Sequence, residues 1–74
     1  NPEGVVEKAL TVAIRVEERE YQDIYPHFRD QALAQQDSKT AEVYQKVIDS
    51  ENQHAQWFQA ALADFQSTQV QAMA

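Results

Sequence analysis

Glu51 and His54 form a Glu-x-x-His pair in the second half of the chain, and Glu18 interrupts an apolar stretch in the first half. In an α-helix, side chains three residues apart project from one face about a turn from each other, so both can reach one ion. Carboxylates and imidazoles that project inward from facing helices are typical of metal sites in helix bundles. The pattern therefore predicts a metal site with Glu18, Glu51 and His54 as ligands and as the catalytic residues.

Two helices must position these ligands, and the spacing of apolar residues predicts both. The first is expected over about residues 3–35 and the second over about residues 39–66, with a frayed tail to residue 74. The inward face of the first helix is expected to carry Val6, Ala9, Leu10, Ala13, Ile14, Tyr21, Tyr25, Phe28 and Ala32. The inward face of the second is expected to carry Val43, Tyr44, Val47, Ile48, Ala55, Phe58, Ala61, Leu62 and Phe65. The predicted fold is all-α, an antiparallel two-helix hairpin that forms one domain over residues 1–74.

The segment between the two helices has the composition of a turn. Residues 35–39 lack apolar side chains and include Asp37 and Ser38, both good N-cap residues. The turn is therefore placed at about residues 35–38. With the turn centred there, Glu18 and Glu51 are offset by roughly four residues, about 6 Å of helix rise. Pro26, a helical bulge, or a turn beginning nearer Leu33 would absorb this offset.

Pro26 is the one anomaly in the first helix. Proline cannot donate a hydrogen bond to the carbonyl four residues earlier, and its ring crowds the preceding turn. Because the helical pattern is present on both sides of Pro26, we expect a kink with the helix resuming. A break at Tyr25 is the alternative.

Several polar residues near the predicted ligands compete with them or support them. Ile14, Tyr21 and Tyr25 align with Glu18 at helical spacing, so Glu17 and Glu20 are assigned to solvent. Glu20 is left open as an outer ligand or transit site. Tyr21 and Tyr25 are core aromatics whose hydroxyl groups are candidates to support the ligands by hydrogen bonding.

A single hairpin of 74 residues without disulfides buries little apolar surface and usually needs a partner or a metal. Pairing two hairpins about a two-fold axis gives a four-helix bundle and doubles the predicted ligands to four carboxylates and two imidazoles. That set suits two metal ions per dimer, with iron or manganese favoured and zinc possible. Trp57 is expected in the packing or at the dimer boundary.

Composition excludes several classes of function. The chain has no Cys, which rules out disulfides, thiolate zinc sites and iron–sulfur clusters within it. A formal net charge of −6 repels phosphate backbones and argues against nucleic-acid binding. The apolar runs are far shorter than the roughly 20 residues needed to span a bilayer, so no membrane association is expected. A reducing cytoplasm is the expected location.

The ligand spacing resembles that of the ferritin-like superfamily, particularly its rubrerythrin and bacterioferritin branches. The resemblance rests on Glu18-x6-Tyr25 and on Tyr44-x6-Glu51-x-x-His54, and it covers roughly residues 9–65. It implies that Glu51 bridges two irons, that Glu18 and His54 are terminal ligands, and that Tyr25 donates a supporting hydrogen bond. Encapsulated ferritins are similar in being single hairpins that dimerise to build an iron site.

From the ligand set and the resemblance together, the function expected is that of a di-iron carboxylate protein. Such a protein would oxidise Fe(II) with oxygen or hydrogen peroxide, in iron handling or in defence against oxidative stress. The alternative is a non-enzymatic helical dimerisation module, or a structural metal site within a larger protein, whose polar residues set the helix register.

Overall fold

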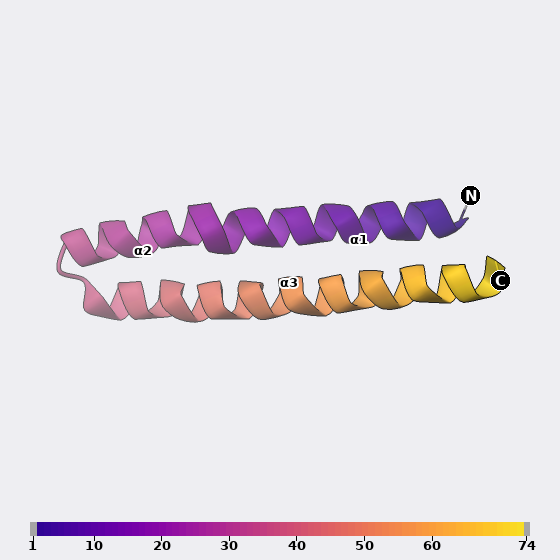
Figure 1. Cartoon of the computed structure of the whole chain (residues 1–74). Coiled ribbons are helices and arrows are strands. Elements are labelled where there is room, and N and C mark those ends of the chain that lie inside the picture. Colours follow the sequence, from indigo (N-terminus) through magenta and orange to yellow (C-terminus); the bar gives the residue numbers. More distant parts are fainter. Residues whose placement is uncertain (1, 74) are drawn as a thin grey trace.

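The computed structural model describes residues 2–73, without the side chains of residues 3, 72 and 73. Two long helical arms lie side by side in antiparallel order, joined by one short turn, so that both chain ends lie at the same end of the molecule (Figure 1). The first arm consists of α1 (Pro2–Arg19), η1 (Glu20–Ile24) and α2 (Tyr25–Ala34), and the second is α3 (Ser38–Met73). The predicted all-α hairpin is confirmed.

The first arm contains a π-helical turn, η1, directly before Pro26. The N–H of Tyr25 donates to the carbonyl of Glu20, five residues earlier, where an α-helix would use the residue four earlier. A wider turn at this point is consistent with the proline, whose ring would crowd the carbonyl of Gln22 in a regular α-helix. The structure thus has a π turn where the sequence predicted an α-helical kink. The helix does not break at Tyr25.

The turn between the arms is closed by backbone and side-chain hydrogen bonds. Gln36 has a φ of 62°, and the N–H groups of Gln36 and Asp37 donate to the carbonyls of Leu33 and Ala32, as in a Schellman motif. The Asp37 carboxylate then caps α3 by accepting hydrogen bonds from the Thr40 N–H at 3.1 Å and from the Thr40 hydroxyl at 2.7 Å. These two bonds lower the pKa of Asp37 below its ordinary value.

The second arm is longer than predicted, because α3 continues to Met73 without a frayed segment after residue 66. Leu62 and Phe65 just before this stretch, and Gln69 within it, are half-buried. The amide of Gln66 donates a 2.7 Å hydrogen bond to Glu7 in α1. Contacts with α1 therefore hold the end of α3 in helical form. Ala74, the last residue of the predicted tail, lies outside the described residues.

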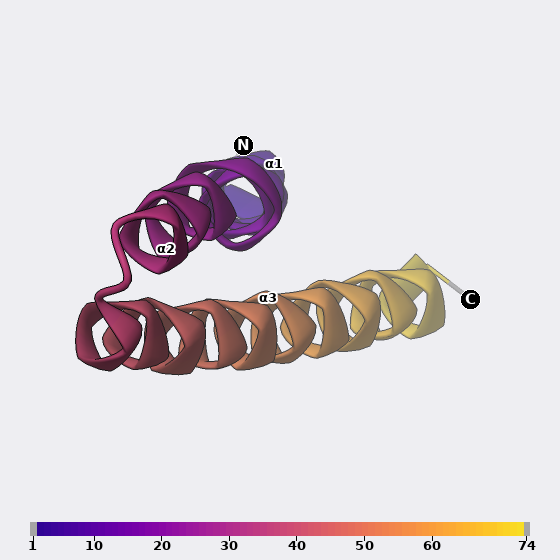
Figure 2. The ribbon, with the colours of Figure 1, turned by 90° about the vertical axis from the view of Figure 1, so that its left-hand side faces the viewer.

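The core between the arms is thin. Its buried apolar residues are Ala32, Ala41, Ile48 and Ala55, the last three at seven-residue intervals along α3. The molecule measures 58 × 16 × 12 Å, and its radius of gyration of 16.7 Å exceeds the roughly 11 Å of a compact domain of this length. Viewed from the turn, α3 slants away from the line of α1 and α2, so the arms cross obliquely (Figure 2).

Several residues predicted to face inward are instead exposed. They are Val6, Ala9, Phe28, Val43 and Ala61. Two helices can cover only one stripe of each other, so a wide apolar face keeps a part in solvent. No helix of the described chain has the length and apolar character needed to cross a membrane.

Candidate metal centre

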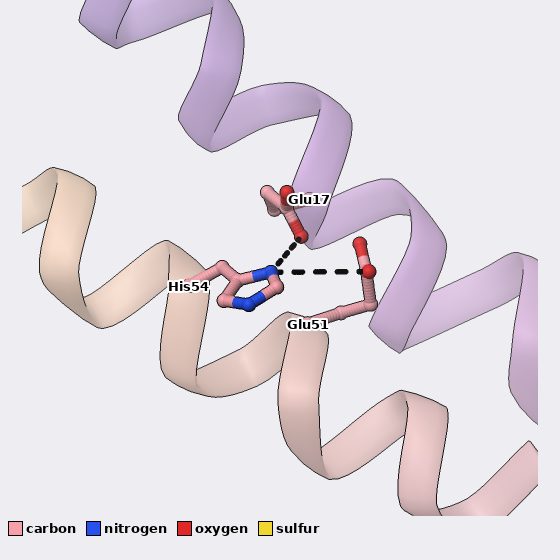
Figure 3. Close-up of side chains that lie close together, drawn as sticks. All are labelled: Glu17, Glu51 and His54. Atoms are coloured by element: carbon pink, nitrogen blue, oxygen red, sulfur yellow. Dashed lines mark ion pairs between the residues drawn. The ribbon is translucent and has the colours of Figure 1, made fainter.

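Three potential metal ligands meet midway along the hairpin, Glu17 from α1 and Glu51 and His54 from α3 (Figure 3). The Nδ1 atom of His54 lies 3.7 Å from Oε2 of Glu17 and 4.0 Å from Oε1 of Glu51. One ligand atom from each residue lies within 4.8 Å of the other two. Two carboxylates and one imidazole at this separation can bind a single divalent cation.

The two carboxylates are largely withdrawn from water. The side chains of Glu17 and Glu51 are 18% and 16% exposed, whereas His54 is 39% exposed. Oε2 of Glu17 and Oε2 of Glu51 are buried and lack a hydrogen-bond partner among the described residues. Unpaired buried carboxylate oxygens are costly, and a cation removes that cost. Oxygen and nitrogen donors of this kind suit iron, manganese or zinc, so these residues fit a metal.

Without a cation, the carboxylates compete for protons. The pKa of Glu51 is raised, first because a hydrogen bond between its carboxyl group and that of Glu17 needs a proton on one of them. Burial and the Glu17 charge raise this pKa further, while a hydrogen bond with Glu20 and the charge of His54 lower it. The pKa of Glu20 is also raised, first by its hydrogen bond with Glu51. A proton shared by the two carboxyl groups and a bound cation are thus alternative ways to offset their mutual repulsion.

The structure brings Glu51 and His54 together as predicted, but their neighbour from the first arm is Glu17 and not Glu18. Glu18 accepts a 3.2 Å hydrogen bond from the amide of Gln59, to the side of the three-residue cluster. The expectation that Glu17 is solvated is wrong, and Glu20 is half-buried beside Glu51. Glu20 therefore borders the cluster without belonging to it.

The π turn explains why the neighbouring carboxylate faces the site. A π turn accommodates one more residue than an α-helical turn. Each residue before the turn therefore lies about 100° around the helix from the position that it would have if the whole arm were a regular α-helix. Counted back from Tyr25 with regular α periodicity, Glu18 faces α3. With one residue absorbed in η1, Glu17 takes that place. Pro26 was the available signal, because a proline inside a helix often marks an irregular turn.

Tyr21 lies within the π turn, and Tyr25 follows it directly. The ring of Tyr25 packs against Phe28 and Tyr44, with centroid distances of 6.4 and 6.1 Å. The hydroxyl of Tyr21 accepts a 3.2 Å hydrogen bond from the amide of Gln22. Both residues are half-buried, and their support of the ligands stays a prediction.

Trp57 covers part of the His54 ring. The two ring centroids are 5.6 Å apart with an interplanar angle of 34°. Trp57 is itself 62% exposed, so its other surface faces solvent. The imidazole thus has carboxylates on its inner side and an indole towards the outside.

The family model described as Rubrerythrin matches residues 2–62. This range includes the whole first arm, all three cluster residues and about the first two thirds of α3. No curated protein and no solved structure matches the chain.

Proposed function

Because the chain belongs to the rubrerythrin family, we propose that it binds iron through Glu17, Glu51 and His54 and oxidises Fe(II) with oxygen or hydrogen peroxide. The observation that carries this proposal is the pair of buried, unpartnered oxygens on Glu17 and Glu51 beside the imidazole. A helix pair gains nothing from burying two ionised carboxylates together unless a cation or a proton neutralises them.

The protein groups have distinct tasks in this proposal. Glu17 and Glu51 supply negative charge from opposite arms, which would hold a cation in the seam between them, and His54 supplies a nitrogen donor. Apolar residues one turn away, such as Ile48 and Phe58, limit the access of water to the seam. Bound iron supplies the electrons that pass to the oxidant when Fe(II) becomes Fe(III).

A second copy of the chain completes the site in this proposal. One hairpin offers three donors, whereas two copies offer the four carboxylates and two imidazoles of a two-iron centre. The surface area favours the same arrangement. A compact monomer of 8.5 kDa exposes about 4,700 Å², but this chain exposes 5528 Å². The surplus, roughly 800 Å², is one partner's share of an interface of standard size.

Iron loading of matched variants tests the proposed function. Purified protein is loaded with Fe(II) without oxygen, its bound iron is counted, and it is then exposed to oxygen while the ferric absorption is followed. We expect the native chain to bind and oxidise iron, and Glu51→Ala to lose both properties. Glu42→Ala is the control, because it removes an equal charge from the surface of the same helix, where Glu42 pairs only loosely with Lys46 at 3.7 Å.

Each other outcome decides against the proposal. Equal iron binding by Glu51→Ala and Glu42→Ala would mean that the cluster is not the site. Stoichiometric binding of zinc or manganese without oxidation of iron would favour a structural metal site. A native chain that binds no metal would favour a helical dimerisation module.

A further inference from the structure

The two long sides of the hairpin, flanking the seam between its arms, differ in chemistry. On one side, the amide residues Gln45, Asn52, Gln59 and Gln66 recur at seven-residue intervals along α3. Three of them bond to charged residues of the first arm. Gln45 accepts from Arg29 at 2.8 Å, Gln59 donates to Glu18 at 3.2 Å, and Gln66 donates to Glu7 at 2.7 Å. We call this side the amide flank.

Four of the large exposed apolar residues, two from each arm, lie on the opposite side. Val43 and Trp57 in α3 come two residues before Gln45 and Gln59, and Val5 and Val16 in α1 come two residues before Glu7 and Glu18. Two residues correspond to about 200° around an α-helix, so these four point away from the amide flank. They are between 51% and 67% exposed. We call the side defined by Val5, Val16, Val43 and Trp57 the apolar flank.

The metal cluster opens towards the apolar flank. His54 lies one residue before the buried Ala55, on the side of the seam opposite to Gln59, and it is the most exposed member of the cluster. Its ring contacts Trp57, which belongs to the apolar flank. The amide flank, in contrast, is already occupied by hydrogen bonds within the chain, which a partner would have to break or match.

We propose that a second copy of this chain docks on the apolar flank, covering Trp57 and closing the open side of the cluster, while the amide flank stays in solvent. The inference rests on the proposed two-copy metal site and adds which face forms the interface. A two-fold axis places the same surface of both copies in contact, so each apolar flank would cover the other. The surplus of exposed area matches the size of interface that this arrangement needs.

Charge substitutions two residues apart test the inference. Trp57→Lys places a charge on the apolar flank, and Gln59→Lys places the same charge on the amide flank, where it can still pair with Glu18. Self-association is measured by sedimentation, once with a chelator and once with excess Zn²⁺. We expect Trp57→Lys to weaken dimerisation at least about tenfold in both conditions, as loss of a buried aromatic anchor does. Gln59→Lys is expected to dimerise like the native chain.

A second variant guards against local effects of losing Trp57. Val16→Lys charges the same flank on the other arm and keeps the indole, the only one in the chain. In the native chain, Trp57 emission should shift to shorter wavelength as protein concentration rises, and Val16→Lys should abolish that shift. Helical content from circular dichroism verifies that both variants fold.

The inference is overturned if the native chain is monomeric in both conditions, if Gln59→Lys weakens the dimer as much as Trp57→Lys, or if the native dimer leaves the emission unshifted. These results do not depend on iron oxidation. A dimer that forms on the apolar flank but takes up no metal would contradict the proposed function and leave the interface standing.

Discussion

Glu17 and Glu18 are adjacent carboxylates with opposite surroundings. Glu17 faces His54 across the seam, and its buried Oε2 has no hydrogen-bond partner among the described residues. Glu18 instead accepts a hydrogen bond from Gln59 on the amide flank. A cation is attracted most where carboxylates are concentrated and poorly hydrated, which is on the Glu17 side. A shift of one residue in the position of α1 relative to α3 thus decides which of the two carboxylates faces the proposed site.

Matched amide substitutions separate the two carboxylates. We expect Glu17→Gln to weaken Zn²⁺ or Fe(II) binding at least about tenfold, because even groups that only support a ligand contribute that much. Glu18→Gln removes an equal charge one residue away and should leave binding within about threefold of native. Titration calorimetry measures both. The reverse order of effects would show that Glu18 is the ligand, as the sequence predicted.

The raised pKa of Glu51 predicts that acid stabilises the metal-free protein. A carboxyl group whose pKa is higher in the folded than in the unfolded chain binds its proton more tightly when folded. Stability is then greatest below the ordinary value of 4.5 and falls as the pH rises through the higher folded value. The raised pKa of Glu20 has the same effect. The lowered pKa of Asp37 has the opposite effect, because its contribution to stability is lost as the pH falls below the ordinary value of 3.8.

Urea unfolding in the presence of a chelator measures this dependence. The midpoint should rise as the pH is lowered from neutral towards 4.5, the ordinary value for Glu51. Glu51→Gln, which cannot ionise, should flatten the change. A midpoint that falls over this range equally in both proteins would contradict the assigned cause.

At the scale of the elements, η1 links the packing of the first arm against α3 to the position of the proposed ligand Glu17. Leu10 and Ile14 in α1 and Ala32 in α2 all pack against α3. Pro26 disfavours a regular α-helical turn between these segments. The π turn allows α1 and α2 both to pack against α3 despite Pro26, and it places Glu17 in the seam between the arms. Tyr25 after the π turn and Glu17 before it therefore both face α3, although eight residues would separate them by about 80° in a regular α-helix.

Deletion of Gln22 tests this coupling. If η1 holds one extra residue, its removal should convert the turn to regular α-helix without rotating α1, and metal binding should still depend on Glu17. Deletion of Asp30 from the regular α2 is the control, because it should rotate α1 by about 100° and abolish binding. Calorimetry with circular dichroism reads out both effects. Loss of binding and helical stability after deletion of Gln22 would mean that α1 is packed in another register.

At the scale of the whole molecule, the hairpin is a rod with too little interior to account for its exposed apolar surface. Among the described residues, the buried apolar side chains are one isoleucine and three alanines, whereas ten large apolar residues are more than a third exposed. Chains of this size need an additional source of stability, which a partner or a metal supplies. In our proposal the two sources coincide, because the same contact covers Trp57 and completes the ligand set.

The amino-acid sequence alone determined the all-α hairpin, the turn with two candidate cap residues, and the Glu51 and His54 pair. These features depend on contacts within a few residues, where composition and spacing are sufficient. The choice between Glu17 and Glu18 was decided only by the tertiary structure, because it depends on how the helix turn before Pro26 accommodates packing on both sides. The spacing of apolar residues along one helix does not reveal that a turn contains an extra residue, because that turn becomes favourable only through packing against the facing helix.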